Sequence, residues 1–108
     1  MLFFLRSVPK ADASQPPTAN YLEKVVKEWE TVIDFKKQGK ILEVFCFANG
    51  KGAFSVWEVD SEEELANTIA GLPMHPFADW EIIPLWTAKE TLTKVKQALE
   101  LLKPSKFY

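Results

Sequence analysis

The side chains best suited to proton transfer in this sequence are one histidine and a few carboxylates. His75, the sole histidine, lies between Pro73 and Pro76. Proline fixes φ and also restricts the residue before it, so we expect a stiff, extended corner that presents the imidazole. Imidazole titrates near neutral pH and suits acid–base catalysis, but an ordinary loop histidine with no catalytic role is the alternative interpretation.

Two carboxylates are predicted to lie on one face of a β-hairpin. Asn49-Gly50, between two apolar segments, favours a two-residue hairpin turn. The register that follows from this turn places Ile41, Glu43 and Glu58 on one face with several phenylalanines. Desolvation there would raise the carboxyl pKa values, as a general base at neutral pH requires. A charge that protects an edge strand from aggregation explains Glu43 equally well.

The remaining candidates come from a predicted helix and from two strands. Glu28 and Glu30 flank the apolar stripe of the helix on opposite sides. Glu30 is a candidate base, although solvated flanks of an amphipathic helix explain both residues. Arg6 could hold a substrate carboxylate through a bidentate pair, or it could pair with a hairpin carboxylate. Trp57 is a candidate aromatic contact for a substrate, with a place in the core or a dimer interface as the alternative.

Apolar periodicity predicts seven elements in the order strand, helix, strand, strand, helix, strand, helix. Their expected ranges are residues 2–8, 21–38, 40–48, 51–59, 62–70, 79–86 and 88–103. Asn20, Ser61 and Thr87, each followed by a glutamate three residues on, are the expected N-caps. The first six elements follow the split βαβ order of ferredoxin-like folds. We therefore expect a single α+β domain over residues 1–108, with a ferredoxin-like core (1–87) and an added C-terminal helix (88–103).

One face of the predicted sheet has no helix to cover it, yet it carries Phe45, Phe47 and Phe54. An antiparallel sheet normally leaves one face polar and in contact with water. Packing this face against a second copy of the chain would bury the phenylalanines. We therefore expect a homodimer built on back-to-back sheets.

The overall composition restricts the functional classes. A net charge of −2 and an isoelectric point near 5.4 leave no basic footprint for nucleic acid. No apolar run reaches the ~20 residues that span a membrane. One cysteine, Cys46, fits a reducing compartment, and we expect a cytoplasmic protein. A single histidine and a single cysteine make no usual transition-metal site, and the four glycines form no phosphate-binding loop, so we expect neither metal nor cofactor.

Two motifs in the hairpin and the proline corner match the pattern of a known family. Ser55-Val56-Trp57-Glu58-Val59 is followed by Leu72-Pro73-Met74-His75-Pro76-Phe77-Ala78-Asp79-Trp80-Glu81-Ile82. The chain resembles the muconolactone Δ-isomerase family, whose pattern reads Ser-Val-aromatic-acid-Val and then Leu-Pro-x-x-Pro-aromatic-x-Asp-x-Glu-aliphatic. The likeness covers residues 1–86, and Glu28 and Glu30 fall near acidic positions on the family's first helix.

The resemblance implies a dimeric α+β barrel that assembles into a larger homo-oligomer. It also implies an enzyme that shifts a proton within an unsaturated lactone from aromatic-compound degradation, without cofactor or metal. The chain departs from the family at Glu43, on a strand where the family's prototype carries basic and histidine side chains. It departs again at His75, where the family has apolar residues.

We therefore predict a cofactor-free isomerase of this type. The predicted catalytic residues are Glu43, Glu30 and His75, and the predicted substrate-binding residues are Arg6, Glu58 and Trp57. Such a proton shift needs a base near the carbon acid and a group that stabilises the dienolate charge. The alternative is a non-catalytic dimeric α+β barrel protein that binds a small hydrophobic ligand or acts as an oligomeric interaction module. A third hypothesis is a cofactor-independent oxygenase on the same fold.

Overall fold

The computed structural model describes residues 1–10 and 17–104, and its elements follow the predicted order. They are β1 (Leu2–Pro9), α1 (Ala19–Lys37), β2 (Ile41–Cys46), β3 (Ala53–Glu58), α2 (Glu62–Ala70), the 3₁₀ helix η1 (His75–Phe77), β4 (Ala78–Leu85) and α3 (Ala88–Leu102). The predicted α+β class is therefore confirmed. The proline corner contains the short helix η1, which the sequence analysis did not predict.

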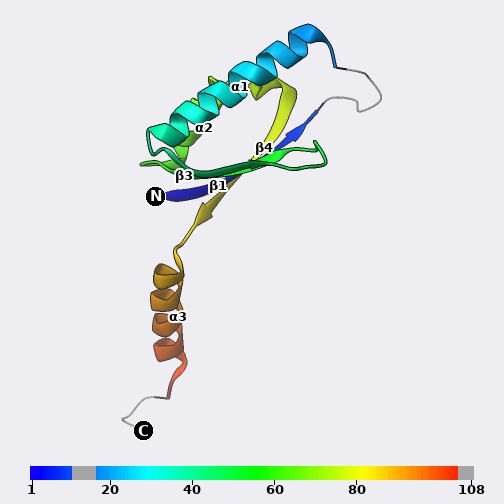
Figure 1. Ribbon diagram of the computed structural model, residues 1–108. Helices are drawn as coiled ribbons and strands as arrows, with labels where there is room; N and C mark the ends of the chain where they lie inside the picture. The colour runs from blue at the N-terminus through cyan, green and yellow to red at the C-terminus, as the bar shows by residue number, and fades with distance from the viewer. Residues whose placement is uncertain (11–16, 105–108) are drawn as a thin grey trace.

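The four strands form one antiparallel sheet in the order β2-β3-β1-β4. Helices α1 and α2 connect strands that are not neighbours along the sheet, and both lie over the same face (Figure 1). Strand β4 is an edge strand, which is where Pro84 is tolerated, because proline has no backbone N–H to donate and one side of an edge strand has no neighbouring strand in the sheet. The opposite face of the sheet is left without a helix above it.

The core lies between the sheet and the two helices. Its most deeply buried large side chains are Trp57, Phe3, Ile41 and Leu65. The Trp57 indole N–H donates to Ser55 Oγ at 2.7 Å, so both polar groups are satisfied although both residues are buried. This pair fixes the orientation of the largest core side chain on β3.

The hairpin keeps the predicted register from the Glu43–Val56 pair to the Cys46–Ala53 pair and departs from it at Ile41 and in the turn. Phe45 pairs with Phe54, as expected, but the Phe47 N–H donates to the Gly52 carbonyl at 2.8 Å and closes a longer loop over residues 48–51. A register shift between Ile41 and Glu43 moves Ile41 to the helix-covered face, where its side chain is 1% exposed. The expectation that Ile41 shares the open face with Glu43 was therefore wrong, because a bulge reverses the side-chain alternation.

The predicted caps were right for two helices and wrong for the first. Thr18, not Asn20, caps α1, and its Oγ1 accepts the Tyr21 N–H at 3.1 Å. Ser61 caps α2 as predicted. Thr87 caps α3 with both bonds of a capping box, at 3.1 and 3.2 Å to Glu90. Each cap satisfies an N–H that has no partner within its own helix.

Helix α3 extends away from the rest of the fold (Figure 1). Two residues separate it from the end of β4, and all fifteen of its residues are exposed. The radius of gyration is 19.1 Å, against about 13 Å for a compact chain of this length. The difference reflects the projecting helix.

Substitution of Gly52 tests how closely the hairpin approaches β1. A Cβ at Gly52 would overlap the Ser7 carbonyl oxygen, and its φ of +139° also disfavours other residues, whereas Gly50 (φ +73°) has open space around it. We expect Gly50→Ala to cost about 1 kcal/mol. Gly52→Ala should cost about 1–3 kcal/mol more, because backbone atoms must move. Urea denaturation of both variants measures the difference, and equal losses would contradict the close approach.

Candidate functional site

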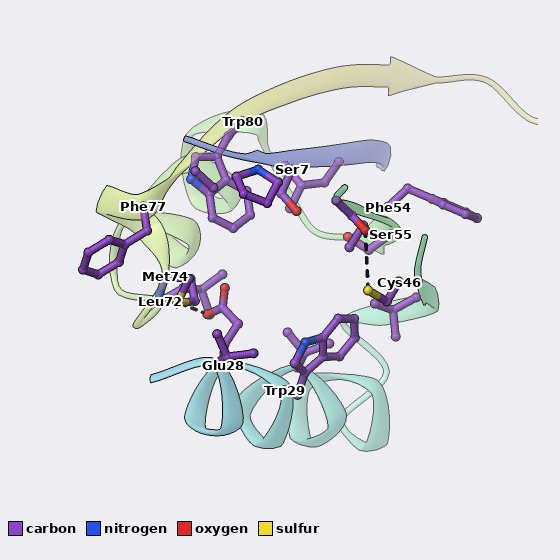
Figure 2. A pocket seen from close by; sticks show the side chains of 18 of the residues that line it. Ser7, Glu28, Trp29, Cys46, Phe54, Ser55, Leu72, Met74, Phe77 and Trp80 are labelled. Carbon is purple, nitrogen blue, oxygen red and sulfur yellow. Dashed lines mark hydrogen bonds between the residues drawn. The ribbon is translucent and has the colours of Figure 1, made fainter. Parts of the chain in front are cut away.

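A cavity of about 380 Å³ lies between α1 and the helix-facing side of the sheet. Its walls come from α1, from all four strands and from the corner that contains η1 (Figure 2). The size falls in the range of pockets that hold small organic ligands. The fold therefore forms a partly open site of the right size for a single-ring ligand.

Small side chains on the sheet create the space. Ser7 pairs with Ala53, and the neighbouring pair is Leu5 with Ser55, so three small residues lie together on the helix-facing side. Larger residues at these positions would fill the gap below α1, as Trp57 does further along β3. The floor is therefore hollow because of local residue size, while the aromatic rings of Trp29 and Trp80 form walls (Figure 2).

Glu28 is the only side chain with a formal charge at neutral pH among the described residues that line the cavity. It comes from the middle of α1, is 8% exposed and points into the cavity (Figure 2). Burial raises the pKa of the Glu28 carboxyl above its usual value, and a hydrogen bond from the Met74 N–H offsets part of this effect. A carboxyl with a raised pKa is the feature that a general base acting near neutral pH requires.

The proline corner positions the Met74 N–H. That N–H donates to Glu28 Oε1 at 3.5 Å. The corner is held by two backbone bonds, from the His75 N–H to the Leu72 carbonyl at 3.0 Å and from the Phe77 N–H to the Met74 carbonyl at 2.9 Å. The Leu-Pro-x-x-Pro motif thus contributes a main-chain donor to the buried carboxylate.

The wall opposite Glu28 offers weaker polar groups. Ser55 Oγ accepts the indole N–H of Trp57, which leaves the Ser55 hydroxyl hydrogen free to donate. Cys46 Sγ lies 3.6 Å from the Gly52 carbonyl oxygen. Ser7 on β1 adds a hydroxyl to this wall, whereas Trp29 adds an indole from α1, on the same side as Glu28. The site therefore pairs one carboxyl with several neutral donors in an apolar surround.

The structure brings one of the six sequence-predicted site residues to this cavity. Trp57 lines it from β3. Glu43 lies on the open face of the sheet, with Oε2 4.0 Å from Lys36 Nζ, and Glu58 accepts from the N-terminal ammonium at 3.1 Å. Arg6 is on the same open face, with its guanidinium carbon 5.9 Å from the Phe47 ring centroid.

The other two predicted residues are exposed. Glu30 lies on the outer side of α1. His75 stacks on Trp80, with ring centroids 6.3 Å apart, and its carbonyl accepts the Trp80 indole N–H at 3.0 Å. The histidine therefore contacts the outside of a cavity wall.

Sequence reasoning placed Glu28 at the edge of the apolar stripe of α1, whereas the structure places it at the centre of the buried side. Val25 and Val32 lie one turn before and after Glu28 and also line the cavity. Their i−3 and i+4 spacing was the available indication. The apolar stripe of α1 is broad, and which half of it is buried depends on where the sheet lies. Local periodicity in the sequence does not give the position of the sheet.

Within residues 1–10 and 17–104, no group of three or more His, Cys, Asp or Glu side chains is arranged to hold a metal ion. None of the described helices combines the length and apolar character needed to cross a membrane.

Comparison with known proteins identifies the family. The model of the muconolactone delta-isomerase family matches residues 1–90. The muconolactone Delta-isomerase of Acinetobacter baylyi is 29% identical over 86 residues, which are 79% of this chain and 88% of that protein. A crystal structure of muconolactone isomerase is 26% identical with a TM-score of 0.69, covering 81% of this chain and 90% of the other.

A second solved structure shares the fold. It is a 5-chloro-2-hydroxyhydroquinone dehydrochlorinase from Burkholderia phenoliruptrix in complex with 2,5-dihydroxybenzoquinone, with 13% identity and a TM-score of 0.57. The match covers 82% of this chain and 97% of that one, and at this identity it shows the fold alone. The family match, in contrast, spans most of the sequence and includes both motifs of the hairpin and the corner. This chain belongs to the muconolactone delta-isomerase family.

Proposed function

We propose that this protein is a cofactor-free isomerase that moves a proton within a small unsaturated lactone or acid, with Glu28 as the base. The observation that supports this most is a buried carboxyl, its pKa raised by desolvation, inside a cavity of single-ring size. The family relative from Acinetobacter baylyi carries the name muconolactone Delta-isomerase. A lactone of that class is therefore the first substrate to test.

The proposed reaction consists of two proton transfers. Glu28 takes a proton from the carbon at one end of the unsaturated system, and the electron pair of that C–H bond moves toward the carbonyl oxygen as a dienolate. The protonated Glu28 then returns the same proton to the carbon at the other end, and the double bond shifts. One carboxyl serves both steps, so the reaction needs no oxidant, reductant or second base.

The surroundings of Glu28 suit this use. A raised pKa brings the carboxyl closer to the dienolate in basicity, which makes both directions of transfer accessible. The mainly apolar lining offers few groups that would hold water beside the carboxyl, which favours return of the same proton. The Ser55 hydroxyl and the Trp29 indole are the neutral donors that face the cavity and could stabilise charge on the oxygen.

A homodimer through the open sheet face is also proposed. Phe54 stacks with Phe4 at 5.8 Å and contacts Phe45 at 5.6 Å, and Phe45 is 55% exposed. An exposed aromatic cluster of this kind favours an interface.

Phe45→Lys should weaken self-association without unfolding the chain, as measured by light scattering and circular dichroism. An unchanged molar mass would contradict this interface.

Replacing Glu28 tests the catalytic proposal directly. Glu28→Gln keeps the shape of the side chain but removes the base, so we expect turnover of an accepted lactone to fall by about 10²–10⁴-fold. In the wild type, kcat/KM should decrease as the pH falls through the raised Glu28 pKa, because the protonated carboxyl cannot accept a proton. Proton exchange from bound ligand in heavy water reports the first step independently of turnover.

Two contrasting variants complete that experiment. Glu63→Gln, on the exposed first turn of α2, is the matched control for removal of one carboxylate. Glu43→Gln tests the carboxylate on the open face. If Glu43→Gln lost turnover while Glu28→Gln kept it, the catalytic role would return to Glu43. Binding of lactones without any proton exchange would favour the alternative function, a protein that binds a small hydrophobic ligand.

The Glu28→Gln variant also tests how burial affects the ionisation of the Glu28 carboxyl. Below the ordinary glutamate pKa, Glu28 is protonated in both the folded and the unfolded chain. As the pH rises toward the raised folded value, the unfolded chain loses its proton first, so the free energy of unfolding falls. Glu28→Gln should therefore be more stable than the wild type at pH 7, with the difference narrowing below about pH 4. Urea denaturation from pH 4 to pH 7 measures the difference. A wild type that is more stable than Glu28→Gln at pH 7 would contradict the raised pKa of Glu28.

A further inference from the structure

Helix α3 carries an apolar stripe that no other part of residues 1–10 and 17–104 covers. Leu92, Val95, Leu99 and Leu102 recur at three- and four-residue spacing and are 54–83% exposed. An amphipathic helix of fifteen residues gains most of its stability from packing, because isolated helices of this length are marginal in water. The matched family region ends at residue 90, so nearly all of this helix lies beyond it. A surface that accepts α3 is therefore required.

Helix α1 offers an acceptor of matching shape. Its inner side lines the cavity, but Leu22, Val26 and Ile33 are 47%, 55% and 50% exposed. They follow one another along one flank of the helix at spacings of four and seven residues. Glu23 and Glu30 run beside this flank, seven residues apart. The flank thus combines an apolar strip with a border that is acidic at Glu23 and Glu30 and becomes basic only at Lys37, in the last turn.

The border of the α3 stripe has the opposite charge. Lys89, Lys96 and Lys103 recur every seven residues beside Leu92 and Leu99. In antiparallel helix pairs the residues at these bordering positions face each other. Matching an acidic border with a basic one favours pairing and sets the direction of the helices.

We propose that α3 docks antiparallel on the α1 flank of a second copy of this chain. Aligning the two stripes places Val95 opposite Val26 and Leu99 opposite Leu22. The same alignment brings Lys96 beside Glu23 and Lys89 beside Glu30. Fifteen helical residues extend about 22 Å, which the longer α1 accommodates. The exchange is reciprocal in a two-fold dimer, so each pair of chains forms the contact twice.

A second copy is the occupant because α3 cannot readily reach its own α1. The two residues between β4 and α3 extend at most about 7 Å, and α3 leaves the sheet on the side opposite α1 and α2 (Figure 1). A copy packed against the open face would lie in the direction in which α3 points. Leu22 also lines the cavity, so docking would place the Leu99 side chain of the other copy near the cavity wall.

Disulfide trapping in the full chain tests the contact. In a Cys46→Ala background, Val26→Cys with Val95→Cys should form a covalent dimer under mild oxidation. The matched control, Val26→Cys with Gln97→Cys, places the thiol on the opposite side of α3 and should give several-fold less dimer. Equal trapping in both variants, or a crosslink only within single chains, would overturn the proposal.

A charge exchange tests the pairing of the borders. Lys89→Glu with Lys96→Glu should weaken self-association by about tenfold, measured as the dimer dissociation constant by sedimentation. Adding Glu23→Lys and Glu30→Lys to the same chain should restore it. Association that is unaffected by the lysine changes, or not restored by the glutamate changes, would overturn docking on α1. All four positions are exposed, so we expect each variant to fold, and circular dichroism checks this.

Discussion

The burial of one carboxyl against one backbone N–H is the constraint on which the site depends. Glu28 on α1 and Met74 in the proline corner lie 46 residues apart in the chain, and their hydrogen bond joins the first helix to the approach of the last strand. A buried carboxylate with a single donor remains costly to ionise, which keeps its pKa raised. More donors would stabilise the anion and weaken it as a base. The sparse hydrogen bonding is thus part of the chemistry.

The corner can supply that donor because its backbone is constrained. Pro73 and Pro76 have no N–H of their own, so the N–H groups of the residues between and after them make the local bonds. The His75 and Phe77 N–H groups close the turn on the Leu72 and Met74 carbonyls, which leaves the Met74 N–H directed at Glu28. Small residues on the sheet then leave the hollow into which the carboxyl points. Packing and chemistry therefore use the same few positions.

Local patterns were sufficient for much of the fold. The element order, the caps Ser61 and Thr87 and the pairing of Phe45 with Phe54 all follow from short-range periodicity and turn chemistry, and the structure confirms them. The bulge that turns Ile41 inward has no comparable local pattern, because it depends on packing against α1. Glu28 was missed for the same reason, since only the sheet determines which half of a broad stripe is buried.

The apolar stripe of α1 is wider than the part that its own sheet covers. A helix that only covered its own sheet would need one apolar side, yet α1 carries a second strip of half-exposed residues that includes Val26 and Ile33. Helix α3 shows the corresponding excess on an element without a neighbour. Exposed apolar strips of this kind favour association, since burying them is worth roughly 25 cal/mol per Å². The two excesses have the same length scale and opposite border charges at Glu23, Glu30, Lys89 and Lys96, which is the physical basis of the proposed pairing between copies of the chain.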